Sequence, residues 1–447
     1  MDLIAQIPFI GGFLATVLPF IIVLGIVVFI HEYGHYIVAR WCGIRSEVFS
    51  VGFGPVMWSR RDRRGTLWQV AALPLGGYVK FAGDSDAASR ADPEALEKMD
   101  TEDRRHTFHG APVGRRMLTV LAGPFFNFFL SIVVFAGLVM WQGMATDRPT
   151  IGTIEPLPQV EQPLRPGDVV LEVNGEPVET FADIYAEARA MEEPGPMLFR
   201  VARNGEELEF EAPYALPAMV YGVEPLSPAS RAGLRRGDVI VEADGEPLAS
   251  FEELREKVLA SEGQSIPITV WRDGREIEKQ ITPAERDTAD GEGGFERRVM
   301  IGVAGASLYF PATETPAPWT AVGHGVERTV DVIVMSLTGL KHIITGTLGA
   351  ENLQGPLGIA QISGETAAQG LVNFITLIAI ISTAIGLINL FPIPVLDGGH
   401  FVAFSIEAAR GRPPSERAMQ VAMTIGLGLI LFLMVFATYN DIMRLVS

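Results

Sequence analysis

The sequence contains a single cysteine, Cys42, so no intramolecular disulfide contributes to its fold. Positive charge is also scarce. The 35 Lys and Arg residues stand against 53 Asp and Glu, and a formal net charge of −18 is unfavourable for a nucleic-acid-binding protein. With 48 % hydrophobic residues the chain is too apolar to be disordered, and 447 residues suit two or three folding units.

Charge of either sign is missing from four long apolar runs. In the first run, residues 8–30 give 23 uncharged positions, enough at 1.5 Å per residue to cross about 30 Å of hydrocarbon. No positive residue precedes it, which favours a retained span over a cleaved signal peptide. We therefore predict four transmembrane helices, at about residues 8–38, 117–141, 371–396 and 421–439.

A fifth apolar stretch, residues 319–348, carries several ionisable side chains. Charged groups at the centre of a bilayer are costly. We therefore predict an amphipathic helix at the membrane surface or packed on the bundle, within a gating segment at residues 311–370.

The distribution of charge predicts the orientation in the membrane. Arginines gather between spans one and two and between spans three and four, which by the positive-inside rule places both loops in the cytoplasm. Residues 145–320 hold 33 Asp and Glu against 16 Lys and Arg, so nearly all the net negative charge falls in this one segment. We expect this segment and both termini to lie outside the cytoplasm.

The acidic segment contains an internal repeat. Residues 165–181 align without gaps on residues 235–251, with nine of seventeen positions identical at an offset of 70. Each copy predicts a strand, a tight turn at Asn-Gly or Asp-Gly and then a helix. The pattern resembles the PDZ domain, which binds extended peptides by adding a strand to a sheet edge. We predict PDZ domains at residues 145–219 and 220–310, and a simple spacer is the alternative.

His31-Glu32-Tyr-Gly-His35 is an HExxH motif directly after the first apolar run. Histidines at i and i+4 lie on one face of a helix and can bind one Zn²⁺, while the intervening glutamate can act as general base. Ionisable residues next to hydrocarbon are expensive unless they have a function, so a chance occurrence explains the location poorly.

Zinc needs a third protein ligand, and the stretch after His35 offers only Glu47. A better candidate is Asp397, which follows Pro392 and Pro394 where the third span reaches the cytoplasm. Spans one and three would then bring their ligands to the same depth, near the cytoplasmic side. We predict one Zn²⁺ per chain at these three residues.

HExxH in the first span, Asn-x-x-Pro-x-Pro-x-Leu-Asp-Gly in the third and PDZ copies between spans two and three resemble the site-2 intramembrane metalloprotease family, in its regulator-of-sigma-E protease branch. The resemblance covers essentially the whole chain. It implies His31, His35 and Asp397 as zinc ligands, Glu32 as base and Asn389 as a contact to the substrate.

By the same resemblance, Gly123 and Asn127 in the second span pack beside the active site and are assigned to substrate binding. An ordinary interhelical hydrogen bond is the alternative for Asn127. Residues 44–82 alternate β-formers with glycines and prolines, and in the family this region dips into the membrane and offers the substrate an edge. Gly76 and Gly77 belong to that predicted substrate contact, and a plain cytoplasmic hairpin is the alternative. His400 is expected to pack near Asp397 rather than to bind metal.

The predicted fold is a polytopic α-helical membrane protein with four transmembrane helices, a membrane-associated β-hairpin and two extracytoplasmic PDZ (α+β) domains. Its membrane halves are residues 1–144 and 371–447. The resemblance implies an intramembrane zinc endopeptidase of the bacterial inner membrane that cleaves single-span proteins, namely an anti-sigma factor after first-step trimming and signal-peptide remnants. The competing function is a non-catalytic membrane scaffold with PDZ modules and a structural metal site. Metal transport would need ionisable residues through the membrane depth, and spans two and four offer none.

Overall fold

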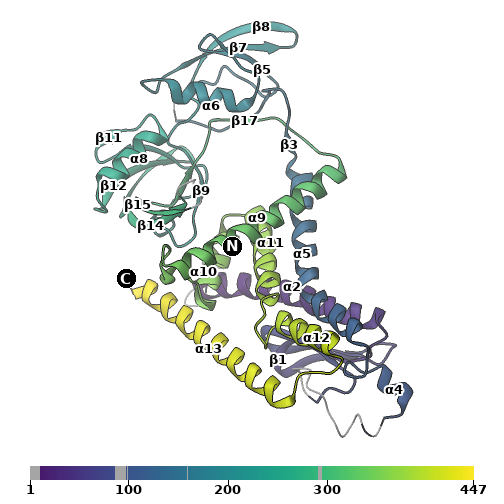
Figure 1. The fold of residues 1–447 in the computed structure, drawn as a ribbon. Coiled ribbons are helices and arrows are strands. Elements are labelled where there is room, and N and C mark those ends of the chain that lie inside the picture. Colours follow the sequence, from purple (N-terminus) through teal and green to yellow (C-terminus); the bar gives the residue numbers. More distant parts are fainter. Residues whose placement is uncertain (1–10, 86–96, 98, 159, 290–293, 447) are drawn as a thin grey trace. The chain divides into compact units, whose positions relative to one another are not determined.

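The computed structural model describes residues 11–85, 97, 99–158, 160–289 and 294–446 (Figure 1). The chain divides into two compact units, one formed by residues 1–138 and 318–447 and the other by residues 139–317. Residues 8–10, where the first span was predicted to begin, lie outside the described residues.

Four helices of the first unit are long and apolar enough to cross a membrane, and they coincide with the four predicted runs. They are α2 (Gly11–Trp41), α5 (Val113–Gln142), α11 (Leu371–Asn389) and α13 (Glu416–Val446). Helix α11 ends at Asn389, earlier than the predicted residue 396, because Pro392 and Pro394 cannot continue a helix.

Helix α5 packs closely against both α2 and α11. A Cβ atom added at Gly34 of α2 would lie 2.6 Å from the carbonyl oxygen of Ala122, and one at Gly386 of α11 would lie 3.0 Å from that of Pro124. Small residues of this kind let helix backbones approach in a membrane, where apolar burial alone gives little driving force. Ser131 adds a polar link, because its hydroxyl donates to the carbonyl of Ala379 on α11 at 2.8 Å.

Two long antiparallel strands, β1 (Ser46–Arg61) and β2 (Leu67–Phe81), follow α2 and form a hairpin with an irregular register. The aromatic rings of Phe49 and Trp68 stack with centroids 4.3 Å apart, and Tyr36 of α2 meets Trp68 edge-on at 5.2 Å. This cluster fixes the hairpin against the helix that carries the HExxH motif. The short helix α4 (Thr101–Arg105) comes next.

The remaining elements of the first unit are α9 (Pro318–Thr345), the 3₁₀ turn η1 (Ala350–Asn352), α10 (Pro356–Ala368) and α12 (Asp397–Arg410). Helix α9 corresponds to the predicted amphipathic helix at 319–348, and it is not one of the helices apolar enough to span among the described residues. Helix α10 packs on α2, where a Cβ at Gly364 would lie 2.9 Å from the Cα of Thr16.

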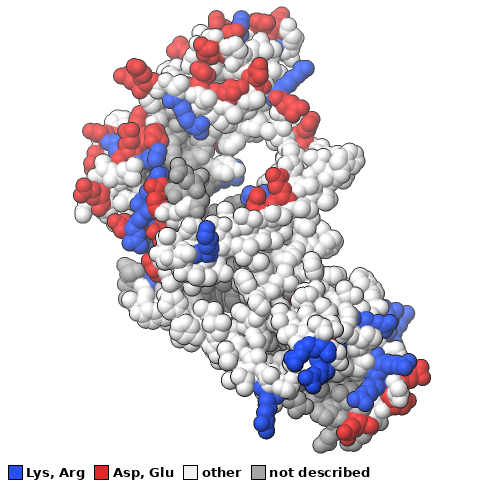
Figure 2. All heavy atoms as spheres, in the orientation of Figure 1, with Lys and Arg blue, Asp and Glu red and all other residues white. Residues whose placement is uncertain are grey.

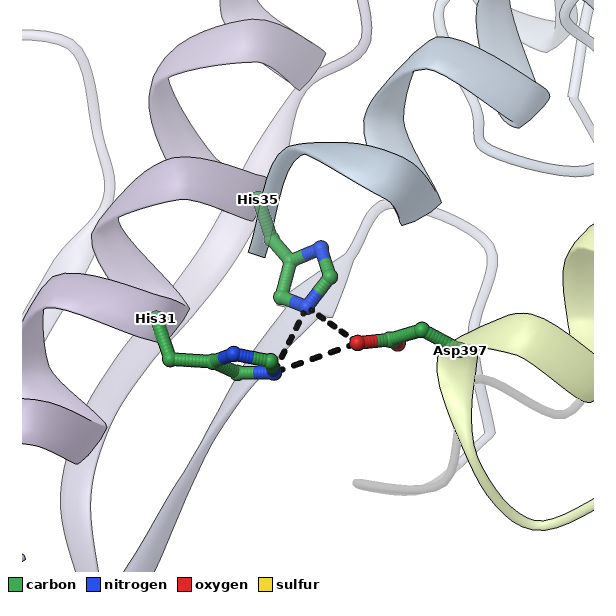
Figure 3. A group of neighbouring side chains, drawn as sticks. All are labelled: His31, His35 and Asp397. Carbon is green, nitrogen blue, oxygen red and sulfur yellow. Dashed lines mark hydrogen bonds and ion pairs between the residues drawn. The ribbon is translucent and has the colours of Figure 1, made fainter. Parts of the chain in front are cut away.

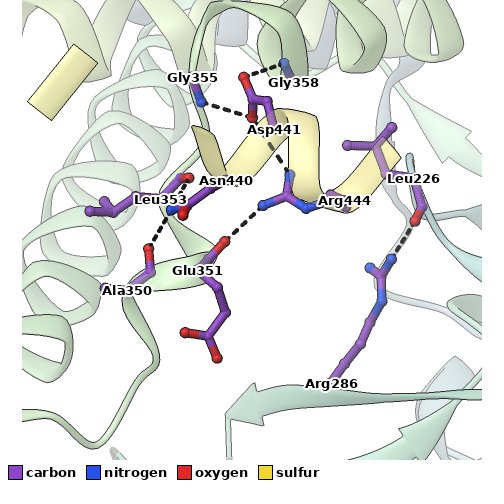
Figure 4. Close-up of polar contacts among 10 residues, drawn as sticks. All are labelled: Leu226, Arg286, Ala350, Glu351, Leu353, Gly355, Gly358, Asn440, Asp441 and Arg444. Carbon is purple, nitrogen blue, oxygen red and sulfur yellow. Dashed lines mark hydrogen bonds and ion pairs between the residues drawn. The ribbon is translucent and has the colours of Figure 1, made fainter. Parts of the chain in front are cut away.

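The last turns of α13 hold the start of α10 (Figure 4). The carboxylate of Asp441 is buried and accepts hydrogen bonds from the backbone N–H groups of Gly355 and Gly358, at 3.0 and 2.9 Å. These are donors that a helix N-terminus otherwise leaves without partners. Asn440 and Arg444 donate to backbone carbonyls in the segment that contains η1, so the polar contacts come from one end of α13.

The second unit contains two copies of one arrangement, in which a four-stranded sheet has its helix inserted between the second and third strands in sequence. The strand, tight turn and helix predicted from the repeat are confirmed in both copies. The first copy consists of β5 (Val169–Val173), β6 (Glu176–Pro177), α6 (Phe181–Ala190), β7 (Met197–Arg203) and β8 (Glu206–Ala212). The second consists of β10 (Val239–Ala243), β11 (Glu246–Pro247), α8 (Phe251–Ala260), β12 (Ile266–Arg272) and β13 (Arg275–Ile281).

A bidentate ion pair between an arginine and a buried aspartate is present in both copies. Arg203 donates to both carboxylate oxygens of Asp168 at 2.7 Å, and Arg272 donates to those of Asp238 at 2.6 and 2.7 Å. Burial alone would raise the pKa of Asp168, but hydrogen bonds from Arg203 and from the backbone N–H of Arg165 outweigh it and hold the pKa below its usual value.

The chain returns to the first copy after completing the second. Strand β17 (Tyr309–Pro311) pairs with β4 (Ile151–Ile154), and Leu308 and Tyr309 are fully buried in the core of the first copy. Strand β18 (Thr313–Glu314) likewise pairs with β3 (Met144–Ala145). The second copy is thus an insertion within the first, an arrangement that the expected boundaries at residues 219 and 310 do not describe.

The second copy is completed by several short elements around its sheet. Strand β9 pairs with β16, and β14 pairs with β15. These elements are β9 (Val220–Val223), α7 (Pro228–Arg231), β14 (Ala284–Ala289), β15 (Phe295–Met300) and β16 (Val303–Gly305).

Figure 2 shows how charge is distributed over each unit. Acidic side chains cover much of the face that the second unit presents in this view, around α6 and α8. The first unit is mostly uncharged over its helices, and its Lys and Arg side chains gather at the end where α4 and α12 lie.

Candidate metal centre

Three side chains from two elements of the first unit converge on one point (Figure 3). His31 and His35 lie one turn apart on the same face of α2, with their rings edge-on and their centroids 4.8 Å apart. Asp397 is the first residue of α12 and reaches toward them from the opposite side. The structure therefore brings together the three residues that the sequence analysis chose as metal ligands.

The distances between the three donor atoms suit a tetrahedral metal ion. Nε2 of His31 lies 3.3 Å from Nε2 of His35, and the two nitrogens lie 3.2 and 3.4 Å from Oδ2 of Asp397. Ligand atoms held about 2.0–2.1 Å from a tetrahedral zinc lie about 3.3 Å from one another. The donor triangle thus has the edge length that a zinc ion requires, and its donor types are those that zinc accepts.

Asp397 is held in place by the broken end of α11. A Cβ atom at Gly398 would lie 2.2 Å from the carbonyl oxygen of Leu390, and one at Gly399 would lie 2.2 Å from that of Ile393, so the turn needs both glycines. Oδ2 of Asp397 is buried, and it contacts the Nε2 atoms of His31 and His35. Burial alone would raise the pKa of Asp397, but the two imidazoles outweigh this and hold the pKa well below its usual range.

Helix α5 lies directly behind the two imidazoles. Nδ1 of His35 is 2.8 Å from the carbonyl oxygen of Thr119, and Nδ1 of His31 is 3.3 Å from the side-chain nitrogen of Asn127. Gly123 lies between these residues, and a Cβ there would come within 2.3 Å of Nε2 of His35. Gly123 and Asn127, assigned from the resemblance to substrate binding, therefore lie against the imidazoles of His35 and His31.

A cavity of about 240 Å³ opens beside the three ligands. Its lining includes Glu32, the backbone of Gly77 on β2, and His400. A Cβ at Gly77 would lie 3.0 Å from Cγ of Glu32 and 2.7 Å from the carbonyl oxygen of Ser50, so the strand passes very close to this glutamate. The volume accommodates several water molecules next to a carboxylate and the ligand atoms.

The other predicted site residues do not belong to the three-residue donor group. Asn389 is the last residue of α11, its amide donates to the carbonyl oxygen of Ile385 at 3.0 Å, and it is not part of the described cavity lining. Gly76 packs against the ring of Phe53, where its φ of +153° and a 2.5 Å approach leave no room for a side chain. His400 lines the cavity without joining the ligand group found among the described residues.

Sequence reasoning missed Thr119, which contributes a backbone carbonyl. Because any residue type carries such a carbonyl, the sequence holds no signal that could have pointed to it. The arrangement as a whole provides three ligands, a further carboxylate and space for water. Structural zinc sites are closed by four protein ligands, whereas catalytic sites leave one position open, so the geometry suits metal-assisted hydrolysis.

Comparisons with known proteins agree with this chemistry. The family model of peptidase family M50 matches residues 19–433. A protein named as a zinc metalloprotease in Agrobacterium fabrum is 38 % identical over 98 % of this chain and 98 % of its own length, and one in Rhizobium meliloti is 35 % identical over 96 % of each. The regulator of sigma-E protease RseP of Salmonella typhimurium is 33 % identical over 95 % of this chain and 98 % of its own length.

Proposed function

Because the chain belongs to peptidase family M50 and is a zinc metalloprotease, we propose that it hydrolyses peptide bonds of single-span membrane proteins within the inner membrane of a bacterium. The observation that carries the proposal is the open three-ligand centre on an apolar helix, next to the free carboxylate of Glu32.

His31, His35 and Asp397 hold the zinc ion in this proposal, and their donor triangle leaves a fourth position free. Bound zinc supplies Lewis acidity, which polarises the scissile carbonyl and acidifies water. Glu32 takes the proton from the attacking water and passes it to the nitrogen of the leaving amine. Its placement in the same cavity as the ligands supports this assignment.

A peptide bond within a transmembrane helix is shielded by the helix, so the substrate must be unwound before water can attack it. We propose that β1 and β2 receive the unwound segment as an added strand. The two strands form a sheet of their own, and β2 runs through Gly77 directly past Glu32, which supports this route. Asn389 would contact the substrate backbone from the end of α11.

We assign the two repeated copies to PDZ modules on the periplasmic side, with both termini on that side and the zinc site near the cytoplasm. The gathering of Lys and Arg at the α4 and α12 end of the first unit supports this orientation. In this assignment the modules exclude substrates with a bulky periplasmic domain. The substrates would be an anti-sigma factor already trimmed by a first protease and remnants of signal peptides, a proposal supported by the likeness to RseP.

The test compares the full-length wild type with Glu32→Gln, both purified in detergent. The expected result is about one zinc per chain in both proteins, with cleavage of a single-span peptide bearing a short periplasmic stub by the wild type alone. Glu102→Gln, a change at an exposed glutamate of α4, serves as the matched control and should cleave like the wild type. Zinc in every protein without cleavage of several substrates by any of them would favour the scaffold function instead.

A further inference from the structure

One strip of α5 faces the two imidazoles at every fourth residue. It consists of Thr119, Gly123 and Asn127, and both side chains that it carries are at most 1 % exposed. Thr119 meets His35, Asn127 meets His31, and Gly123 leaves the space that the rings occupy. Residues four apart lie on one face of a helix, so this strip runs alongside the His31 and His35 pair of α2.

The direction of each imidazole determines where its proton must be. Both rings point Nε2 toward Asp397, the position in which they bind zinc. A neutral imidazole that binds a metal through Nε2 carries its hydrogen on Nδ1, and a buried N–H needs an acceptor. For His35 this acceptor is the carbonyl oxygen of Thr119 at 2.8 Å. His31 needs an equivalent acceptor, and Asn127 is the group that faces its Nδ1.

The amide of Asn127 provides that acceptor when its oxygen and nitrogen exchange places. With the nitrogen toward His31, two donors face each other across 3.3 Å, and Oδ1 of Asn127 is buried with no hydrogen-bond partner among the described residues. The two orientations of an amide are distinguished by the hydrogen-bond network rather than by shape. Turning the group gives the N–H of His31 an acceptor and gives Oδ1 of Asn127 a donor.

The backbone of Asn127 is also fixed from the other side. Its carbonyl oxygen accepts a hydrogen bond from the hydroxyl of Ser382 on α11 at 2.9 Å, which ties α5 to α11 at this residue. The backbone that carries the Asn127 side chain is therefore fixed, as is required of a residue that orients a metal ligand.

We propose that Asn127 is a positioning residue whose side-chain carbonyl accepts the Nδ1–H of His31 and so sets the tautomer and direction of this zinc ligand. Thr119 does the same for His35 through its backbone. The inference rests on the zinc metalloprotease function proposed above. It gives Asn127 a task at the metal, in place of the substrate contact or the plain interhelical hydrogen bond that the sequence allowed.

The test measures zinc affinity by competition with a chelator, using full-length protein in detergent. Asn127→Leu keeps the volume and removes the acceptor, and Asn127→Asp keeps an oxygen acceptor. Gly137→Ala is the control on the same helix, because a Cβ there meets no atom within 4 Å. We expect Asn127→Leu to weaken zinc binding by about 10- to 100-fold, Asn127→Asp to stay within about 3-fold of the wild type, and Gly137→Ala to bind zinc like the wild type. Asn127→Ala replaces the leucine variant if the latter does not fold.

Two results would overturn the inference. Wild-type zinc affinity in Asn127→Leu together with lost cleavage would mean that the residue acts on the substrate. Equal weakening in Asn127→Leu and Asn127→Asp would mean that an acceptor at this position does not matter and that the residue serves only helix packing. Because the readout is zinc affinity, a wild type that binds zinc but cleaves no membrane substrate would refute the proposed function and leave this inference standing.

Discussion

Replacing Gly123 by alanine should disable the metal centre with one added methyl group. The new Cβ would lie 2.3 Å from Nε2 and 2.6 Å from Cε1 of His35, and 2.8 Å from Cε1 of His31, whereas ordinary van der Waals contacts begin at 3.4 Å. The ring of His35 cannot simply turn aside, because its Nδ1 is bound to the carbonyl of Thr119. Relief therefore requires a shift of about 1 Å between α5 and the ring, a displacement that can cost on the order of 100-fold in rate.

Gly137 on the same helix offers a matched control, because a Cβ there meets no atom within 4 Å. Alanine raises the intrinsic helix propensity at both positions by a similar amount, about 1 kcal/mol, so a loss confined to Gly123→Ala cannot come from the helix itself. We expect Gly123→Ala to lose zinc affinity and at least about 100-fold in cleavage rate, while Gly137→Ala keeps both. Zinc binding and cleavage at wild-type levels in Gly123→Ala would show that the described spacing of α2 and α5 is wrong.

Two further predictions concern the hairpin and the repeated modules. Gly77→Ala should reduce cleavage by at least about 10-fold and leave the zinc content unchanged. The new Cβ would press on Glu32 and on the backbone of Ser50, but not on His31, His35 or Asp397. Loss of zinc together with activity would contradict this prediction. The pKa of Asp168 is lower in the folded chain than its unfolded value of about 3.9. The ion pair with Arg203 therefore stabilises the second unit fully above about pH 3.9, and this stabilisation is lost as the pH falls through the folded-state pKa. Asp168→Asn should flatten this acid dependence, measured by hydrogen exchange of residues 139–317 in the full-length protein, and an unchanged profile would assign the acid sensitivity to other groups.

The sequence predicted the apolar helices and the two histidines of the candidate metal site because both depend on local spacing. Four charge-free runs of sufficient length and an i, i+4 pair of histidines can be recognised without any knowledge of distant contacts. Asp397 lies more than 350 positions from the histidines, so it was chosen by comparing the depths at which two spans end. The end of α11 was placed too late, because Pro392 and Pro394 were treated as part of the span rather than as its stop.

The remaining features depend on how side chains and backbone groups are oriented in space, which the sequence does not show. Asn127 was assigned from the resemblance to the family motif, but nothing in the sequence shows whether its amide faces a substrate, another helix or His31. The return of residues 309–311 to the first copy rests on a strand of three residues, too short to show a period of alternation. Thr119 acts through its backbone, which leaves no trace in residue type.

Because β3 pairs with β18, the segment that contains the repeated modules begins and ends at the same place in the fold. The chain leaves toward the modules at Met144 and Ala145 and comes back at Thr313 and Glu314, and these four residues are hydrogen-bonded neighbours. An insertion whose two ends meet can be lost, exchanged or enlarged without pulling apart the elements on either side. The repeated copies can therefore change in sequence, size or number while the helices that carry the candidate metal site stay as they are.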